Sequence, residues 1–120
     1  EKNNAHYRYA LGLYLYEKGR LLSEAYNNEF FRSRKMSRQT DIQVLQNKAE
    51  GDRLLRESIK HLNSACELDP GNLEYLKALA WAYYINRQLS KAYETFQLVL
   101  KNDPFDIGLI MALKDLKERL

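Results

Sequence analysis

Residues 73–106 read LEYLKALAWAYYINRQLSKAYETFQLVLKNDPFD, and this stretch decides the fold. In its first half, Leu76, Leu79 and Tyr83 recur at spacings of three and four, the apolar stripe of an amphipathic helix. The second half repeats the pattern with Leu89, Ala92, Tyr93, Phe96, Val99 and Leu100. Only residues 86–88 separate the halves, so we expect the two helices to fold back as an antiparallel hairpin.

The chain has two prolines, Pro70 and Pro104, which stand 34 residues apart and each follow an aspartate. Proline ends a helix because it lacks the backbone N–H that the next turn requires. Asn72 and Asp106 follow two residues later and can cap the next helix, and Ser90 offers a cap for the helix between them. The two prolines therefore indicate the same position in two consecutive units.

Residues 107–120 predict a last amphipathic helix. Its apolar face carries Leu109, Ile110, Leu113, Leu116 and Leu120, and its other side is charged. A helix with one apolar and one charged face is suited to capping the exposed end of a helical core.

Residues 73–106 resemble one tetratricopeptide repeat, a 34-residue helical hairpin with the pattern W-x2-L-G-x2-Y, then A-x3-F, then P. The matching residues are Leu76, Leu79, Ala80, Tyr83, Ala92, Phe96 and Pro104. Two positions depart, since Leu76 replaces tryptophan and Ala80 replaces glycine. The resemblance implies an all-α fold in which antiparallel helical hairpins form an α-solenoid with a C-terminal capping helix. Small residues at Ala80 and Ala92 would let the two helix backbones approach.

Counting back by 34 residues gives further repeat-like units at 39–72 and 5–38 within a single domain, 1–120. The pattern weakens in these units, and two arrangements explain it. In the first, three repeats follow one another, and residues 20–26 and 53–59 each open a second helix. In the other, an insertion extends two helices into one long hairpin whose tip lies near RSRKMSRQ, residues 32–39.

The glycines are isolated, so the sequence contains no glycine-rich loop for a phosphate group. Gly12 lies within a helical pattern and is interpreted as a residue of helix packing. Gly19, Gly51 and Gly71 are interpreted as turn residues.

Catalytic and metal sites need convergent polar groups, of which this sequence has few. His6 and His61 are the only histidines, and no second ligand type lies one helical turn from either. Cys66 follows Ala65 in an apolar setting and is interpreted as a small packing residue rather than a nucleophile. We therefore expect no enzyme, no metal and no cofactor.

The composition points to a protein of the cytoplasm. In the 120 residues, 19 basic and 16 acidic residues give a net charge of +3, too balanced to indicate nucleic acid. The longest uncharged apolar run, residues 78–85, is far shorter than a transmembrane span. The single cysteine, Cys66, suits a reducing compartment. We expect a cytoplasmic location, provided that no targeting segment precedes Glu1.

The aromatic residues suggest a function. In tetratricopeptide arrays the first helices of the repeats line a concave surface that binds peptides. The resemblance therefore implies a noncatalytic protein-interaction scaffold with a groove that binds a protein or peptide partner. The positions that match the family's binding positions are Tyr9, Leu13, Tyr16, Lys77, Trp81 and Tyr84. The competing interpretation is that these aromatic residues only pack between neighbouring helices.

Two other functions remain open at this stage. The apolar face of residues 107–120 could be covered by another copy of the chain, which would make the domain a homo-oligomerisation element. A basic cluster could bind an acidic or phosphate-rich partner, because arginine suits bidentate contacts to such groups. Its members are Arg32, Arg34, Lys35 and Arg38.

Overall fold

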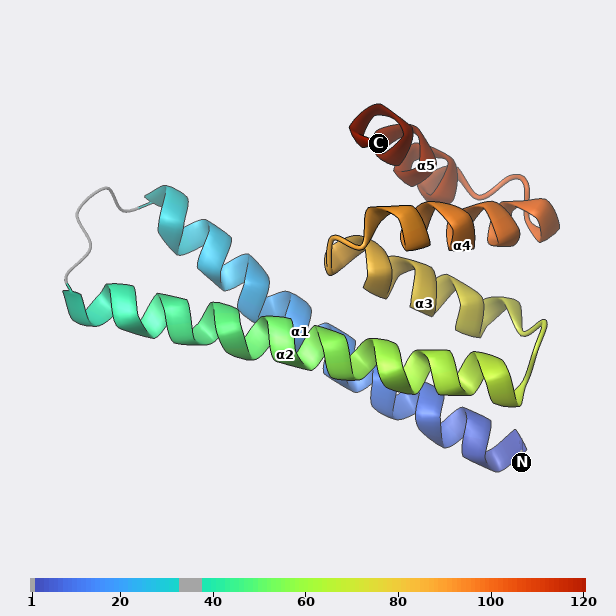
Figure 1. The fold of residues 1–120 in the computed structure, drawn as a ribbon, viewed down its shortest axis with the longest axis horizontal. Coiled ribbons are helices and arrows are strands. Elements are labelled where there is room, and N and C mark those ends of the chain that lie inside the picture. Colours follow the sequence, from blue (N-terminus) through green and yellow to red (C-terminus); the bar gives the residue numbers. More distant parts are fainter. Residues whose placement is uncertain (1, 33–37) are drawn as a thin grey trace.

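The computed structural model describes the backbone of residues 2–32 and 38–120 and the side chains of residues 4–24, 42–43 and 45–120. Over these ranges the chain is helical and contains no strand, which confirms the predicted all-α class. The helices are α1 (Lys2–Arg32), α2 (Arg38–Leu68), α3 (Leu73–Ile85), α4 (Leu89–Asn102) and α5 (Ile107–Arg119) (Figure 1). None of these described helices is long and apolar enough to cross a membrane.

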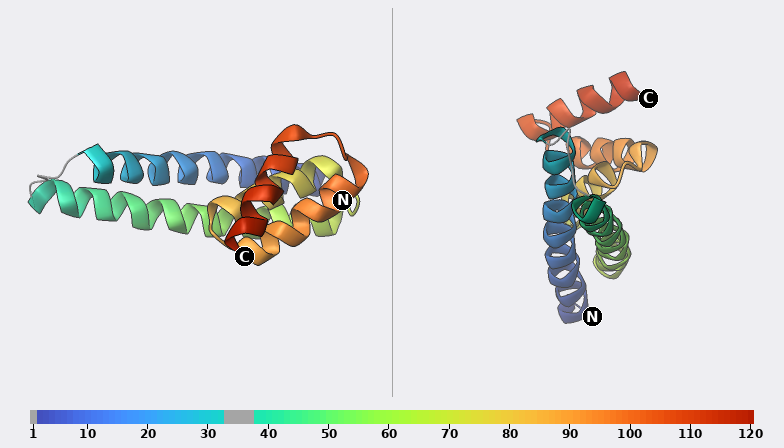
Figure 2. Two further views of the ribbon diagram at one scale, coloured as in Figure 1. Left: turned by 90° about the horizontal axis from the view of Figure 1, so that it is seen from above. Right: turned by 90° about the vertical axis from the view of Figure 1, so that its left-hand side faces the viewer.

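The helices form two antiparallel pairs followed by a single helix. Helices α1 and α2 make a long hairpin, α3 and α4 make a short one, and α5 packs on α4 (Figures 1 and 2). Helix α3 contacts α2 and, over a shorter stretch, α1. Figure 1 shows that α3, α4 and α5 lie beside one half of the long hairpin, while its other half extends past them.

The three C-terminal helices lie where the sequence predicts them. Asn72 caps α3, since its Oδ1 accepts a hydrogen bond from the Tyr75 backbone N–H at 3.2 Å. Asp106 caps α5 in the same way, accepting from the Leu109 N–H at 3.2 Å. The predicted cap at Ser90 is wrong, because α4 begins directly after Gln88 and no side chain caps it.

The two long helices differ from part of the expectation. Both α1 and α2 run without a break through Gly19 and Gly51, so the predicted turns at these glycines are wrong. For the same reason, no new helix opens within residues 20–26 or 53–59. The helix boundaries are those of the long-hairpin arrangement. Gly71, with φ at +85°, does lie in a turn as predicted.

Gly19 and Gly51 lie where the backbones of α1 and α2 touch. A Cβ atom on Gly19 would lie 2.9 Å from the carbonyl oxygen of Gly51. A Cβ atom on Gly51 would lie 3.0 Å from the carbonyl oxygen of Gly19. Backbone atoms cannot swing aside as the end of a side chain can, so this crossing requires the absence of both side chains.

Gly12 marks a second close approach in the same hairpin and confirms the prediction of a packing role. A Cβ atom there would lie 2.7 Å from Cγ of Leu62, which is fully buried. The buried Ser58 hydroxyl donates a 2.8 Å hydrogen bond to the Gly12 carbonyl oxygen. This bond satisfies the hydroxyl away from water and fixes the register of α1 against α2.

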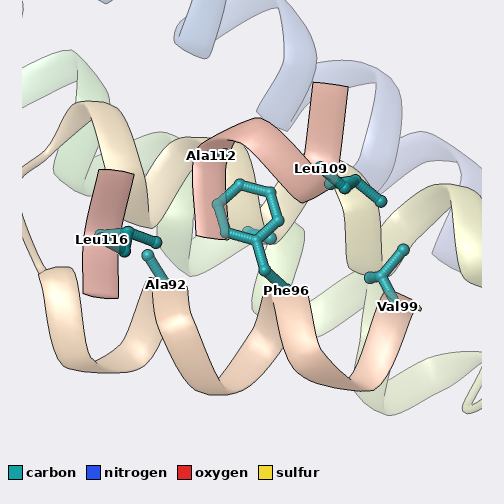
Figure 3. Packing of buried hydrophobic residues seen from close by; sticks show 7 residues of the cluster. Ala92, Phe96, Val99, Leu109, Ala112 and Leu116 are labelled. Carbon is teal, nitrogen blue, oxygen red and sulfur yellow. The ribbon is translucent and has the colours of Figure 1, made fainter. Parts of the chain in front are cut away.

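The largest hydrophobic cluster joins α3, α4 and α5. Ala80 of α3 and Ala92 of α4 are fully buried. Phe96 is fully buried beside them and faces α5 (Figure 3). The cluster consists of Ala80, Ala92, Phe96, Val99, Leu109, Ala112 and Leu116. Burial of Leu109 and Leu116 therefore attaches the last helix to the rest of the fold.

Candidate functional site

The predicted partner-binding residues gather along the seam between α1 and α3. On α1 they are spaced by four and three residues, which places them on one face of that helix. Together with residues of α3 they line a shallow groove of about 400 Å³. The groove residues are Tyr9, Leu13, Tyr16, Glu74, Lys77, Ala78 and Trp81. All the predicted residues except Tyr84 are therefore brought together.

Tyr9 is held at one end of the groove by two contacts with α3. Its ring stacks on Tyr75, with 4.6 Å between ring centroids. Its hydroxyl donates a hydrogen bond to Oε1 of Glu74 at 3.2 Å. Burial, followed by the charge of Glu74 and this hydrogen bond, raises the pKa of Tyr9 to about 12. The side chain is thus a neutral donor in a fixed position.

Tyr16 and Tyr9 also contribute to packing between helices. Both rings pack against a buried cluster formed by Leu62, Leu79 and Ala82. Burial is the main cause of a raised pKa for Tyr16. Packing and groove lining are therefore not exclusive, because each ring is only partly buried.

Lys77 contacts two carboxylates at the edge of the groove. Its Nζ atom lies 2.9 Å from Oδ2 of Asp103 and 3.4 Å from Oδ2 of Asp106. The hydrogen bond with Asp103 is the main cause of its raised pKa. With Glu74 nearby, this edge presents three carboxylates and one ammonium group, a surplus of two negative charges. The edge is therefore suited to a cation rather than to an anion.

Trp81 lies between the groove and the hydrophobic cluster of α3, α4 and α5. Its ring meets Phe96 edge-on, with 5.0 Å between centroids, and meets Tyr84 edge-on at 5.8 Å. The ring is partly exposed, so one part packs and another lines the groove. These contacts fix the indole, which can contact a ligand without first losing side-chain freedom.

Tyr84 lies outside the groove, contrary to its grouping with the other predicted residues. Its hydroxyl donates a hydrogen bond to Oδ2 of Asp115 at 2.5 Å. This bond is the main cause of the raised pKa of Tyr84 and of the lowered pKa of Asp115. Tyr84 therefore connects α3 to α5.

Glu74 and Ala78 line the groove but were not among the predicted site residues. Both could have been found from spacing, because they lie three residues before Lys77 and three before Trp81 on the same side of α3. What spacing cannot give is the hydrogen bond from Tyr9 to Glu74.

The predicted basic cluster of Arg32, Arg34, Lys35 and Arg38 lies outside the residues whose side chains the structure describes.

Reactive groups are sparse among the described side chains. Burial raises the pKa of the half-buried Cys66 thiol to about 11, which leaves little thiolate at neutral pH. The Nδ1 atom of His61 lies 3.1 Å from Nη1 of Arg8. No group of three His, Cys, Asp or Glu side chains in this described part is placed to hold a metal ion.

No protein-family model matches this sequence, and no curated protein is significantly similar to it. The functional interpretation therefore depends on the groove and on the pattern of residues 73–106.

Proposed function

We propose that this chain is a noncatalytic protein-interaction module that binds a partner segment in the groove between α1 and α3. The observation that carries the proposal is that Tyr9, Leu13, Tyr16 and Trp81, from two helices far apart in sequence, line one apolar hollow. Such pockets, with fixed aromatic walls and a few polar groups at the edge, are typical sites for an anchoring side chain.

We further propose that the module is a tetratricopeptide-like helical repeat whose first hairpin is lengthened. Full burial of Ala80 and Ala92 between α3 and α4 supports this proposal, since the family uses small residues at these positions. The turns after α2 and α4, which contain Pro70 and Pro104, lie 34 residues apart and support it as well. On this proposal α1 and α3 are the first helices of two units, and their shared face is the recognition surface.

The expected ligand is an extended or helical peptide with an aromatic or aliphatic anchor and a nearby lysine or arginine. The anchor would be buried among the rings of Tyr9, Tyr16 and Trp81, where each Å² of apolar surface contributes about 25 cal/mol before binding costs are subtracted. The cation would face the surplus carboxylates beside Lys77, which favours association with such a partner.

Selection from a random peptide library on the intact chain tests this proposal. We expect the enriched peptides to combine an aromatic or large aliphatic residue with a lysine or arginine within a few positions. Enrichment of acidic peptides, or no enrichment over an unrelated helical protein, would contradict the proposed ligand class.

Self-association is a second candidate function, and one observation favours it. Phe105, Ile107 and Met111 are 87%, 73% and 67% exposed, and the last two lie one turn apart on α5. A contiguous exposed apolar patch is typical of a protein-binding surface. On this candidate a second copy covers the patch. Light scattering should then show a mass that rises with concentration and falls to the monomer in the Ile107→Gln, Met111→Gln variant, whereas a monomer at every concentration rules it out.

A further inference from the structure

A second hollow, of about 380 Å³, lies next to the groove where the long hairpin passes the end of α3. Its wall on α1 begins with Arg20, one turn after Tyr16 of the groove. Its other walls come from α2, from the α3–α4 turn and from the end of α5. Five cationic residues line this basic pocket, namely Arg20, Lys48, Arg56, Arg87 and Arg119, against only two acidic residues, Glu24 and Asp52.

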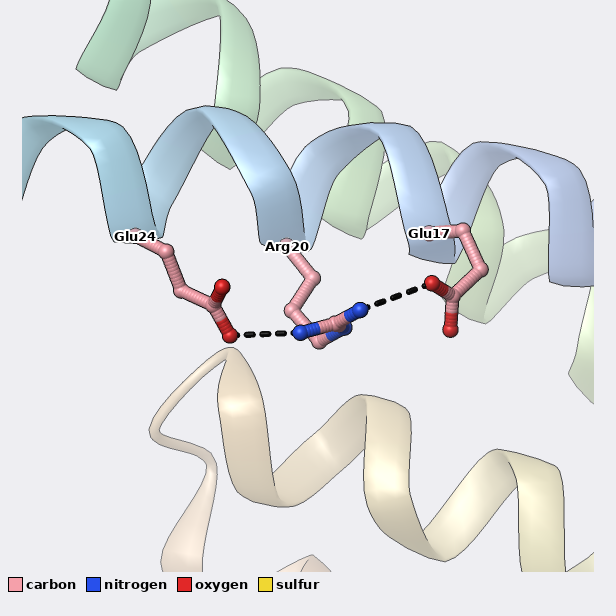
Figure 4. Close-up of polar contacts among 3 residues, drawn as sticks. All are labelled: Glu17, Arg20 and Glu24. Carbon is pink, nitrogen blue, oxygen red and sulfur yellow. Dashed lines mark hydrogen bonds and ion pairs between the residues drawn. The ribbon is translucent and has the colours of Figure 1, made fainter.

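Three of these cations have carboxylate partners within the protein. Arg20 lies between Glu17 and Glu24 on α1, at 2.8 Å and 2.5 Å, and the three side chains project toward the end of α3 (Figure 4). Lys48 lies 3.6 Å from Asp52, and Arg119 lies 3.2 Å from Asp115. These side chains contribute positive charge but already have partners.

Arg56 and Arg87 differ from the other three. Neither guanidinium group has a hydrogen bond or an ion pair with any side chain that the structure describes. They reach the same pocket from different elements, Arg56 from α2 and Arg87 from the α3–α4 turn. Two exposed guanidinium groups that converge without a carboxylate between them repel each other, which an anion would relieve.

The backbone of Arg87 strengthens this observation. Its φ is +61°, in the left-handed region that favours glycine at the end of a helix. Its N–H donates to the carbonyl oxygen of Tyr84 at 3.1 Å, which holds the turn in place. An arginine in a strained backbone position at the mouth of a pocket suggests a function for its side chain.

We propose that the basic pocket binds an oxyanion group, a phosphate or a carboxylate, through the guanidinium groups of Arg56 and Arg87. Arginine suits this task because its planar fork donates two parallel hydrogen bonds to such a group. Arg20, Lys48 and Arg119 add a positive field around the site. The proposal does not depend on the groove, since neither arginine lines it.

The test is a titration of the isotope-labelled chain with pyrophosphate and, in a second arm, with citrate, at constant ionic strength. We expect amide resonance shifts centred on Arg56, Asn86 and Arg87. The Arg56→Gln, Arg87→Gln variant should weaken binding at least about tenfold, because both bidentate contacts are lost. Tighter pyrophosphate binding would identify a phosphate-bearing ligand, and tighter citrate binding a carboxylate-bearing one.

A matched control is the Lys114→Gln, Lys117→Gln variant, which removes the same charge from an exposed part of α5 outside the pocket. It should retain the affinity of the unaltered chain. Equal weakening in both double variants would show only diffuse charge attraction and would overturn the site. Binding that survives loss of Arg56 and Arg87, or shifts from neither anion at millimolar concentration, would overturn it as well.

Discussion

At the scale of single residues, the absence of a side chain matters as much as its presence. Gly19 and Gly51 allow the carbonyl group of one long helix to lie against the Cα atom of the other. In a helix facing solvent, glycine would only cost stability relative to alanine, about 0.5–1 kcal/mol. Here that cost permits the close packing of α1 on α2.

We predict that Gly19→Ala destabilises the protein by about 1–3 kcal/mol, because the added methyl group forces the two backbones apart. Urea unfolding followed by circular dichroism would measure the change. The control is Gly108→Ala in α5, where a Cβ atom lies 3.4 Å from the nearest side-chain atom, an ordinary contact. That variant should be unchanged or up to about 1 kcal/mol more stable. Equal effects at the two glycines would contradict the close backbone contact.

The Tyr9 hydroxyl should titrate late, with a pKa of about 12 against an ordinary value of 10.0. Since folding raises this pKa, the neutral phenol stabilises the fold fully below pH 10 and loses this contribution as pH rises toward 12. Tyrosinate absorbance would follow the step, and Tyr9→Phe should remove it. A titration between pH 10 and 12 that is the same in both proteins would contradict the contact with Glu74.

Local spacing predicted some residues well and others not at all. Tyr9, Leu13 and Tyr16 share a helix face, so their common position followed from the helical repeat alone. Tyr84 fits the same pattern, but its hydroxyl is taken by Asp115, which lies 31 residues further along the chain. The role of Gly51 was missed because glycine favours turns and close packing alike.

At the scale of elements, α5 is held by polar contacts at both ends as well as by its buried face. Near its start, Asp106 caps the helix and contacts Lys77 of α3. Near its end, Asp115 accepts a hydrogen bond from Tyr84. These contacts fix the helix that carries Arg119 into the basic pocket.

We predict that α5 loosens before the long hairpin when the pH falls below about 4. The Leu109 N–H, with Lys77, lowers the pKa of Asp106, and the Tyr84 hydroxyl, with Arg119, lowers that of Asp115. Both carboxylates therefore stabilise the fold above their ordinary value of 3.8 and lose this effect as pH falls through the lowered values.

Amide exchange protection factors measured across this pH range test the prediction residue by residue. Protection in α5 should fall while that in α2 persists, and Asp106→Ala should produce the same loss of α5 protection at neutral pH. Asp106→Asn should retain more protection, since asparagine is also a good N-cap but lacks the charge that pairs with Lys77. Loss of protection in α2 and α5 at one pH would contradict separate loosening.

The sequence predicted the short helices more completely than the long ones. Caps at Asn72 and Asp106 and the nearby prolines mark where α3 and α5 begin. In the long hairpin, residues 20–26 and 53–59 carry patterns that suit a helix start as well as a helix interior. The choice between the two arrangements depends on the contact of Gly19 with Gly51, which is a tertiary feature.

At the scale of the molecule, the lengths of the two hairpins are unequal. Helices α1 and α2 have 31 residues each, and α3 and α4 have 13 and 14. At a rise of about 1.5 Å per residue, the first hairpin is longer by roughly 25 Å. The long hairpin therefore continues beyond the end of α3, as Figure 1 shows. The basic pocket lies at this step, so its residues come from four separate parts of the chain and could not be grouped from sequence.

The central claim is that the groove between α1 and α3 binds a partner segment, and Trp81 reports on it directly. Trp81 is the only tryptophan in the chain and lines the groove. Its fluorescence can therefore follow titration with peptides selected on this protein. The test variant is Ala78→Gln, which fills the groove with a longer side chain, and its matched control is Ala10→Gln on an exposed position of α1.

We predict that peptide binding changes the Trp81 emission of the unaltered chain and of Ala10→Gln with the same affinity. Ala78→Gln should weaken that affinity by at least about tenfold, a loss of about 1.4 kcal/mol, while its helical content stays the same. Peptides that bind Ala78→Gln as tightly as the unaltered chain would contradict the assignment of the groove.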